Sequence, residues 1–192
     1  MTQRGLGTAL AIGALLICAV LLVAGLGDAS RNPSLPLSHA SIIREQAAAK
    51  HLDPALIAAV IYAESKFEPR PSSAGAEGLM QILPATAYYL AHLSGGSRFT
   101  ASDLATPRIN VAYGSYYLRY LLDHYHGDEM LAVAAYNGGL SNVDRWVSQA
   151  EGSGGQLSAA SIPFPETREY VQRVLAAQRA YRATYPRELG LQ

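Results

Sequence analysis

The sequence has almost no cysteine and no excess of charge of either sign. Cys18 is the only cysteine, so no intramolecular disulfide can form and the fold must be stabilised by packing. The formal net charge is zero, which argues against nucleic acid as a partner, because nucleic-acid binding needs a basic surface. Only His124 and His126 stand close together among five histidines. Without a third ligand nearby, we expect no metal and no cofactor.

The length and composition predict one domain. The chain has 192 residues, and 49% of them are hydrophobic, which is enough for one well-packed core. Apolar or small side chains recur every three or four positions over residues 111–125, as expected for a helix buried along one side. We therefore expect an all-α fold, in a monomer.

The amino-terminal segment predicts a membrane anchor. Residues 5–27 carry no charged side chain, and a helix of about 22 such residues is roughly 33 Å long, enough to cross a bilayer. Arg4 favours an amino terminus in the cytoplasm. We favour an uncleaved anchor, although Gly25 and Gly27 leave signal-peptide cleavage as the alternative. The predicted segments are a stub and anchor at 1–29, a linker at 30–37, a domain at 38–185 and a tail at 186–192.

A candidate catalytic acid lies on the helix that follows Asp53 and Pro54, which are suitable capping and first-turn residues. Leu56, Val60 and Glu64 are spaced by four and share one face, so Glu64 continues an apolar stripe. Burial and the negative end of the helix both raise the pKa of its carboxyl group. A carboxylic acid that stays protonated near neutral pH is suited to act as a general acid.

Three motifs in order resemble those of the soluble-type lytic transglycosylases, which share a lysozyme-like fold with goose-type lysozyme. They are the sequence ESKF at residues 64–67, GAEGLMQILP at residues 75–84 and AYNG at residues 135–138. A later stretch, FPETREYV at residues 164–171, is similar to the closing motif of that family. The likeness covers roughly residues 38–185, and it implies a lysozyme-like helical domain with Glu64 as the catalytic residue.

The resemblance also implies roles for residues around the acid. Tyr170 is expected to reach the carboxylate, and a serine in the following loop is expected to hold it by a hydrogen bond. The spacing is one residue short of the family pattern, so Ser72 and Ser73 both fit, and we choose Ser73. The substrate-binding residues implied by the motifs are Met80, Gln81, Tyr136 and Asn137. Core packing is the alternative for Met80 and Tyr170, and helix capping is the alternative for Asn137.

The implied activity is that of a peptidoglycan lytic transglycosylase. Such an enzyme cleaves the β-1,4 bond between N-acetylmuramic acid and N-acetylglucosamine and forms 1,6-anhydro-N-acetylmuramic acid, with the lone glutamate as acid and then base. One alternative is a lysozyme-type hydrolase, if a loop acid reaches the cleft. Another is a non-catalytic scaffold that binds peptidoglycan, although a binder gains nothing from burying Glu64. We expect a single-pass protein of the bacterial cytoplasmic membrane whose domain lies on the periplasmic side and contacts glycan strands.

Overall fold

The computed structural model describes residues 35–95 and 99–191, so the anchor predicted at residues 5–27 lies outside the described residues. The described elements are the α-helices α2 (Ala40–Lys50), α3 (Pro54–Ser65), α4 (Pro84–Ser94), α5 (Pro107–His124), α6 (Glu129–Gly138), α7 (Leu140–Gly152) and α8 (Pro165–Thr184), with short 3-10 helices at Ala101–Ala105 and Ala159–Ser161. An isolated bridge between Glu77 and Ile82 is the only β pairing in this part of the chain. The predicted all-α class is confirmed there. None of these helices is long and apolar enough to cross a membrane.

Helix α3 lies at the centre of the core. Asp53 caps it by accepting a hydrogen bond from the Ala55 amide at 2.9 Å, and Pro54 occupies its first turn, as predicted. Every side chain from Ala55 to Ile61 is buried. The helix ends where Lys66 adopts a left-handed conformation with φ of 53°. Glu64 therefore stands in the last turn of a helix that is otherwise surrounded by the core.

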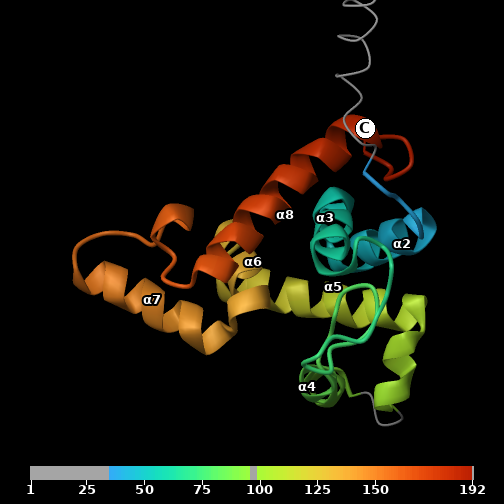
Figure 1. Cartoon of the computed structure of the whole chain (residues 1–192), viewed down its shortest axis with the longest axis horizontal. Helices are drawn as coiled ribbons and strands as arrows, with labels where there is room; N and C mark the ends of the chain where they lie inside the picture. The colour runs from blue at the N-terminus through green and yellow to red at the C-terminus, as the bar shows by residue number, and fades with distance from the viewer. Residues whose placement is uncertain (1–34, 96–98, 192) are drawn as a thin grey trace, which may run out of the picture. The chain divides into compact units, whose positions relative to one another are not determined.

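Helix α8 lies beside α3 in the opposite direction (Figure 1). Near its carboxyl end, Gln178 and Arg182 each donate to the carboxylate of Asp53 at 2.7 Å. Near its amino end, Tyr170 reaches Glu64 at the other end of α3. The hydrogen bonds at Asp53 and at Glu64, which lie near opposite ends of α3, fix the register of α8 on α3. This register brings Tyr170 to the acid.

The remaining helices surround this pair. Helix α5 packs against α2 and α6, and α6 in turn packs against α8 and α7. Helix α4 packs on α5 at the far side from α8, and the loop between α3 and α4 covers the end of α3 that carries Glu64 (Figure 1). That loop, residues 66–83, contains the second of the three motifs up to its last residue, Pro84, which begins α4.

The ends of the helices show two further features. Helix α2 begins after His39, which has a φ of 56° and makes no side-chain cap. Helix α7 extends from Leu140 to Gly152. The domain limits remain predictions, although the described helices belong to a compact unit that begins at Pro36. Past the end of α8, Leu189 is only 1% exposed, and Arg44 of α2 bonds the carbonyl oxygen of Glu188.

Candidate active site

The end of α3 is fastened to the loop that follows it. Ser65 lies directly after Glu64, and its hydroxyl is 2.7 Å from the carbonyl oxygen of Leu79. Lys66 and Phe67 both have positive φ, 53° and 64°, a conformation that is uncommon for residues other than glycine. The chain therefore turns sharply after Ser65. Because Ser65 bonds the second motif, the first two motifs form one structural unit beside the acid.

Glu64 is partly buried and accepts a hydrogen bond from the hydroxyl of Tyr170 at 2.6 Å. Desolvation raises the pKa of its carboxyl group from 4.5 to about 7, while the Tyr170 hydrogen bond and the positive charge of Arg173 lower it. Arg173 lies over the ring of Tyr170, 5.7 Å from its centroid. Burial therefore outweighs the two groups that favour the anion. The acid is protonated over much of the range below neutral pH.

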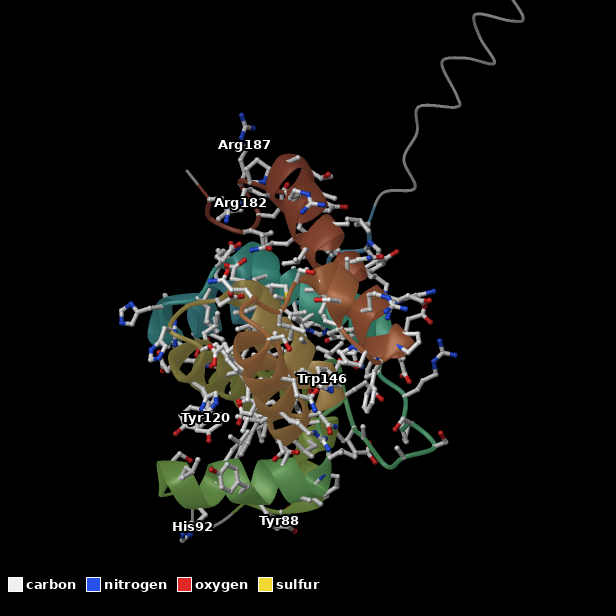
Figure 2. The ribbon with its side chains drawn as sticks, turned by 90° about the vertical axis from the view of Figure 1, so that its left-hand side faces the viewer. Tyr88, His92, Tyr120, Trp146, Arg182 and Arg187 are labelled. Atoms are coloured by element: carbon white, nitrogen blue, oxygen red, sulfur yellow. The ribbon has the colours of Figure 1, made fainter. Side chains whose placement is uncertain are left out.

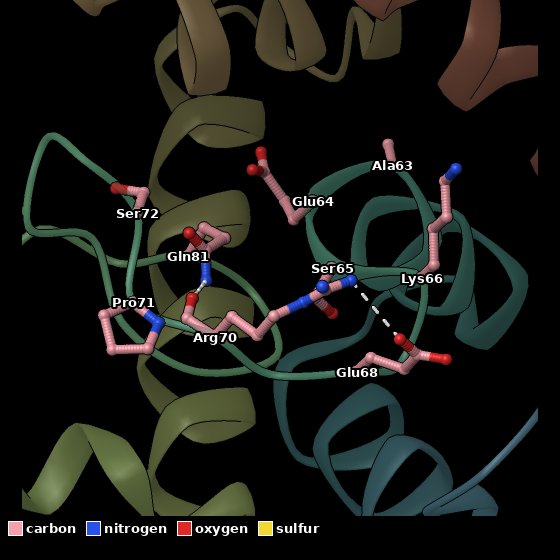
Figure 3. Close-up of a pocket in the computed structure, with 9 residues that line it drawn as sticks. All are labelled: Ala63, Glu64, Ser65, Lys66, Glu68, Arg70, Pro71, Ser72 and Gln81. Atoms are coloured by element: carbon pink, nitrogen blue, oxygen red, sulfur yellow. Dashed lines mark hydrogen bonds and ion pairs between the residues drawn. The ribbon is translucent and has the colours of Figure 1, made fainter.

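The carboxyl group faces an open pocket of about 380 Å³ (Figure 3). The pocket is lined by the end of α3 and the loop after it, with the residues Ala63, Glu64, Ser65, Lys66, Glu68, Arg70, Pro71, Ser72 and Gln81. Glu68 is the other carboxylate in this lining. It forms an ion pair with Arg70 at 3.3 Å, and its side chain is 74% exposed. Only Glu64 has the apolar setting that keeps a carboxyl group protonated.

A buried asparagine holds the second motif in place. Asn110 of α5 is fully buried, accepts from the Met80 amide at 2.8 Å, and donates to the carbonyl oxygens of Glu77 and Leu104 at 2.8 and 3.1 Å. Gly78 packs against this amide with a φ of +76°, and a Cβ there would lie 2.1 Å from Asn110 Nδ2. Only glycine fits at residue 78 without moving the loop.

Gln81 and Tyr136 complete the wall near the acid. The side chain of Gln81 donates to the carbonyl oxygens of Arg70 and Gly78, each at 2.8 Å, and so joins both sides of the loop. The hydroxyl of Tyr136 donates to the carbonyl oxygen of Met80 at 2.9 Å. Burial, followed by the charge of nearby Glu64, raises the pKa of Tyr136 well above its ordinary value. The structure therefore brings Gln81, Tyr136 and Tyr170 together around Glu64.

Other residues chosen from the sequence lie differently. Met80 is fully buried, and its sulfur packs against Gly114 of α5, so its side chain belongs to the core. Asn137 faces α8, where its side-chain oxygen accepts from Thr167 at 2.9 Å. The Met80 side chain therefore belongs to the core in place of the expected position in the groove. The Asn137 side chain is partly exposed, and its role in substrate binding stays a prediction.

The structure does not bring Ser73 to the acid. Ser73 is exposed on a turn and has no hydrogen bond to Glu64. Ser72 does line the pocket, but its hydroxyl accepts from the Ala76 amide at 2.9 Å and closes the turn. The hydroxyl that bonds Glu64 comes from Tyr170 alone among the described residues. Ser72 thus closes a turn and Ser73 lies on it, so neither hydroxyl holds the acid.

Sequence reasoning missed two residues of the site. Arg173 lies one helical turn after Tyr170, and the i, i+3 spacing on α8 was the available signal. Asn110 falls on the apolar stripe of α5 with Gly114 and Leu118, so a polar residue at a core position could have identified it. No cluster of three or more His, Cys, Asp or Glu side chains that could hold a metal is present in residues 35–95 and 99–191.

The fold and the site define a helical domain built around one embedded carboxylic acid. Its sequence matches the transglycosylase SLT domain over residues 41–158 and the soluble lytic transglycosylase helical domain over residues 161–190. The chain belongs to the transglycosylase SLT family. The second match covers α8, the helix that carries Tyr170.

Individual relatives share this region with the chain. The soluble lytic murein transglycosylase of Escherichia coli K12 is 32% identical over 153 residues, which are 77% of this chain and 23% of that protein. The membrane-bound lytic murein transglycosylase C of Cronobacter sakazakii is 32% identical over 163 residues, which cover 73% of this chain and 45% of that protein.

A solved structure has the same fold. The lytic transglycosylase Slt of Pseudomonas aeruginosa, solved as an inactive glutamate-to-glutamine mutant, superposes with a TM-score of 0.70 and 31% identity over 78% of this chain and 24% of that one. The chain thus spans less than half the length of each of these three proteins.

Proposed function

We propose that the chain is a peptidoglycan lytic transglycosylase, with Glu64 as its only catalytic carboxylate. The observation that carries the proposal is the setting of Glu64, whose pKa is raised to about 7 by burial at the edge of an open pocket. A general acid must be protonated before it acts, and a pKa near the working pH satisfies this need. The inactive glutamate-to-glutamine mutant of the Pseudomonas relative gives further support.

In the proposed first step, Glu64 gives its proton to the oxygen of the β-1,4 bond between N-acetylmuramic acid and N-acetylglucosamine. The bond from that oxygen to C1 of N-acetylmuramic acid then breaks. In the second step, the Glu64 carboxylate takes the proton of the C6 hydroxyl of the same sugar, and that oxygen bonds C1. The product is 1,6-anhydro-N-acetylmuramic acid, and Glu64 is protonated again. No water is consumed in either step.

The arrangement of acids favours this reaction over hydrolysis. Inverting and retaining hydrolases use a second carboxylate to activate water or attack the sugar. Glu68 lines the pocket, but it is highly exposed and paired with Arg70. Tyr170 and Arg173 support the second step, because both stabilise the anion that Glu64 becomes after giving up its proton. One carboxyl group therefore serves in both steps.

The test is the chemical identity of the product. Purified peptidoglycan is digested with the protein, and the released muropeptides are weighed by mass spectrometry. Transglycosylation predicts fragments lighter by one water than those that lysozyme releases. Fragments with reducing ends would overturn the proposal in favour of hydrolysis. Binding of peptidoglycan without any release would favour a non-catalytic scaffold.

We further propose that residues 5–27 anchor the protein in the cytoplasmic membrane of a bacterium, with the enzymatic domain on the periplasmic side. The uncharged run supports this assignment, and one relative is a membrane-bound enzyme. A chain shortened to begin at Ser30 should be water-soluble and keep its helical circular dichroism, while the full chain should sediment with membranes. Aggregation of the shortened chain would contradict the assignment.

A further inference from the structure

The pocket at Glu64 carries an excess of positive charge. Its lining contains two cations, Lys66 and Arg70, and Glu68 is the one carboxylate besides Glu64. Arg70 and Glu68 form an ion pair at 3.3 Å and so neutralise each other. Glu64 is uncharged below its pKa of about 7. While the acid holds its proton, the charge of Lys66 is therefore not balanced within the lining.

The ammonium group of Lys66 stands without an anionic partner. Its side chain is exposed, and it makes no ion pair or hydrogen bond within residues 35–95 and 99–191. The other lysine of the sequence, Lys50, bonds Gln46 Oε1 at 2.5 Å. Figure 3 shows the side chains of Glu64 and Lys66 extending to the same side from the end of α3. An unpaired cation thus stands beside the acid in one pocket.

The backbone at Lys66 is unusual for a lysine. Lys66 caps the end of α3 with a φ of 53°, a position where glycine or asparagine is usual because a side chain there is strained. Its amide donates to the carbonyl oxygen of Tyr62 at 3.1 Å, and Ser65 before it is bonded to the Leu79 carbonyl oxygen. Strained positions of this kind occur preferentially at functional sites. The fixed turn therefore presents the lysine at the pocket from a constrained backbone.

The substrate of the proposed reaction brings an anion to this pocket. Of the two sugars in the strand, only N-acetylmuramic acid carries a lactyl arm. The arm ends in a carboxylate when it is bare, and otherwise it continues into a peptide whose residues carry carboxylates. It leaves C3 of the same ring whose C1 reacts at Glu64. The charged arm therefore belongs to the sugar that must lie beside the acid.

We propose that Lys66 determines specificity by binding a carboxylate on the lactyl arm of the N-acetylmuramic acid whose bond is cleaved, either that of the arm itself or that of the attached peptide. The inference rests on the proposed function, because it names the group of the same substrate that the pocket selects. The ammonium group is a compact charge with three donors, so it receives a carboxylate in more than one orientation. Lys66 takes no part in proton transfer.

The test compares strands that differ only in charge. Binding is measured by titration calorimetry with the full chain carrying Glu64→Gln, so that cleavage does not consume the ligand. The probes are a peptide-free and a peptide-bearing strand of equal length, each with free carboxylates and with its carboxylates converted to amides. At low ionic strength the parent should bind the free form of one pair about two- to fivefold more tightly, the range for one exposed ion pair. Lys66→Gln should abolish this preference, and Lys66→Arg should keep it.

Arg187 supplies a matched control. Its side chain is exposed, makes no ion pair within the described part of the chain, and does not line the pocket. Figure 2 shows it past the end of α8, near Arg182 and on the opposite side of the molecule from Tyr88 and His92. Arg187→Gln removes the same charge as Lys66→Gln and should keep the preference of the parent. An equal loss in both variants would assign the effect to the net charge of the protein and overturn the proposal.

The two pairs of strands identify the source of the carboxylate. A preference within the peptide-free pair assigns it to the lactyl arm, and a preference within the peptide-bearing pair assigns it to the peptide. Equal binding within both pairs would overturn the proposal, as would a preference that survives in Lys66→Gln. All variants should bind the amidated strands equally, which shows that the site is intact. The proposed function is judged separately, by anhydro products from the chain with Glu64 present. Anhydro products without any charge preference would refute only the role of Lys66.

Discussion

The hydroxyl of Tyr170 lies 2.6 Å from Oε1 of Glu64 and joins the first half of α8 to the last turn of α3. Burial raises the pKa of Glu64, and this hydrogen bond and Arg173 lower it, so the value of about 7 results from opposing effects. Tyr170 is itself only 2% exposed, and its own pKa is raised well above the ordinary value, first by burial and then by Glu64. It therefore stays protonated and donates to the acid.

We predict that Tyr170→Phe changes the pH dependence of cleavage. The substitution removes a hydrogen bond that favours the Glu64 anion, so the pKa of Glu64 should rise further. Because the general acid must be protonated, the decline in rate on the alkaline side should move to higher pH, and the maximal rate should lie between those of the parent and Glu64→Gln. The measurement is the rate of muropeptide release as a function of pH.

Tyr125→Phe is the control for this experiment. It removes a hydroxyl that donates to Asp144 at 2.9 Å, and neither residue lines the pocket at Glu64. In this variant the decline in rate on the alkaline side should occur at the same pH as in the parent. If the decline in Tyr170→Phe also stays at that pH, the hydrogen bond does not set the pKa of Glu64.

We predict that Glu64 makes the protein less stable as the pH rises. The folded state binds a proton on Glu64 up to about pH 7, whereas the unfolded chain releases it near pH 4.5, so this group favours the folded state at low pH. That contribution is lost as the pH rises from about 4.5 to about 7. The free energy of unfolding of Glu64→Gln, compared with the parent, should increase over this interval by on the order of 3 kcal/mol.

Urea denaturation of both proteins at several pH values measures this difference. Other titrating groups are common to both proteins and cancel in the comparison. A difference that stays constant between pH 4 and pH 8 would mean that the pKa of Glu64 is not raised in the folded protein.

We predict that Asn110→Ala destabilises the loop that forms one wall of the site. Its side chain makes three hydrogen bonds, and their loss removes the partner of the Met80 amide and one donor each from the carbonyl oxygens of Glu77 and Leu104. The free energy of unfolding should fall by roughly 2 to 4 kcal/mol. Asn142→Ala removes a part-buried bond to the Gly138 carbonyl oxygen and an exposed bond that Asn142 accepts from Arg145, and it should cost less than about 1 kcal/mol. Equal costs for the two variants would refute the role given to Asn110.

Local signals predicted the helix that carries the acid. Asp53 and Pro54 fix the start of α3 by chemistry contained in two adjacent residues, and the four-residue spacing of Leu56, Val60 and Glu64 placed the acid on a buried face. The position of Tyr170 depended on resemblance, because 106 residues separate it from Glu64 and no local rule joins them. The register of α8 on α3 supplies the missing physical reason, through the contacts of Asp53.

Sequence patterns could not predict the contacts between distant segments of the chain. Met80 was placed on the groove wall by the resemblance of its motif, yet the small residue Gly114 on α5 leaves space that its side chain fills. Ser73 was selected by counting along a loop, and counting cannot say which way a turn points its hydroxyl groups. The ring contact between Tyr117 of α5 and Tyr136 of α6 becomes visible only in the folded chain.

The most direct test of the account is the cleavage rate of Glu64→Gln, with Glu68→Gln as its control. Glutamine keeps the shape of Glu64 but has no proton to give, so release of muropeptides should fall at least about a hundredfold, the lower range for loss of a general acid. Strand binding should persist. Glu68 lines the same pocket as an exposed ion-paired group, and its replacement should leave the rate near that of the parent. A folded Glu64→Gln protein that cleaves at nearly the parent rate would contradict the account.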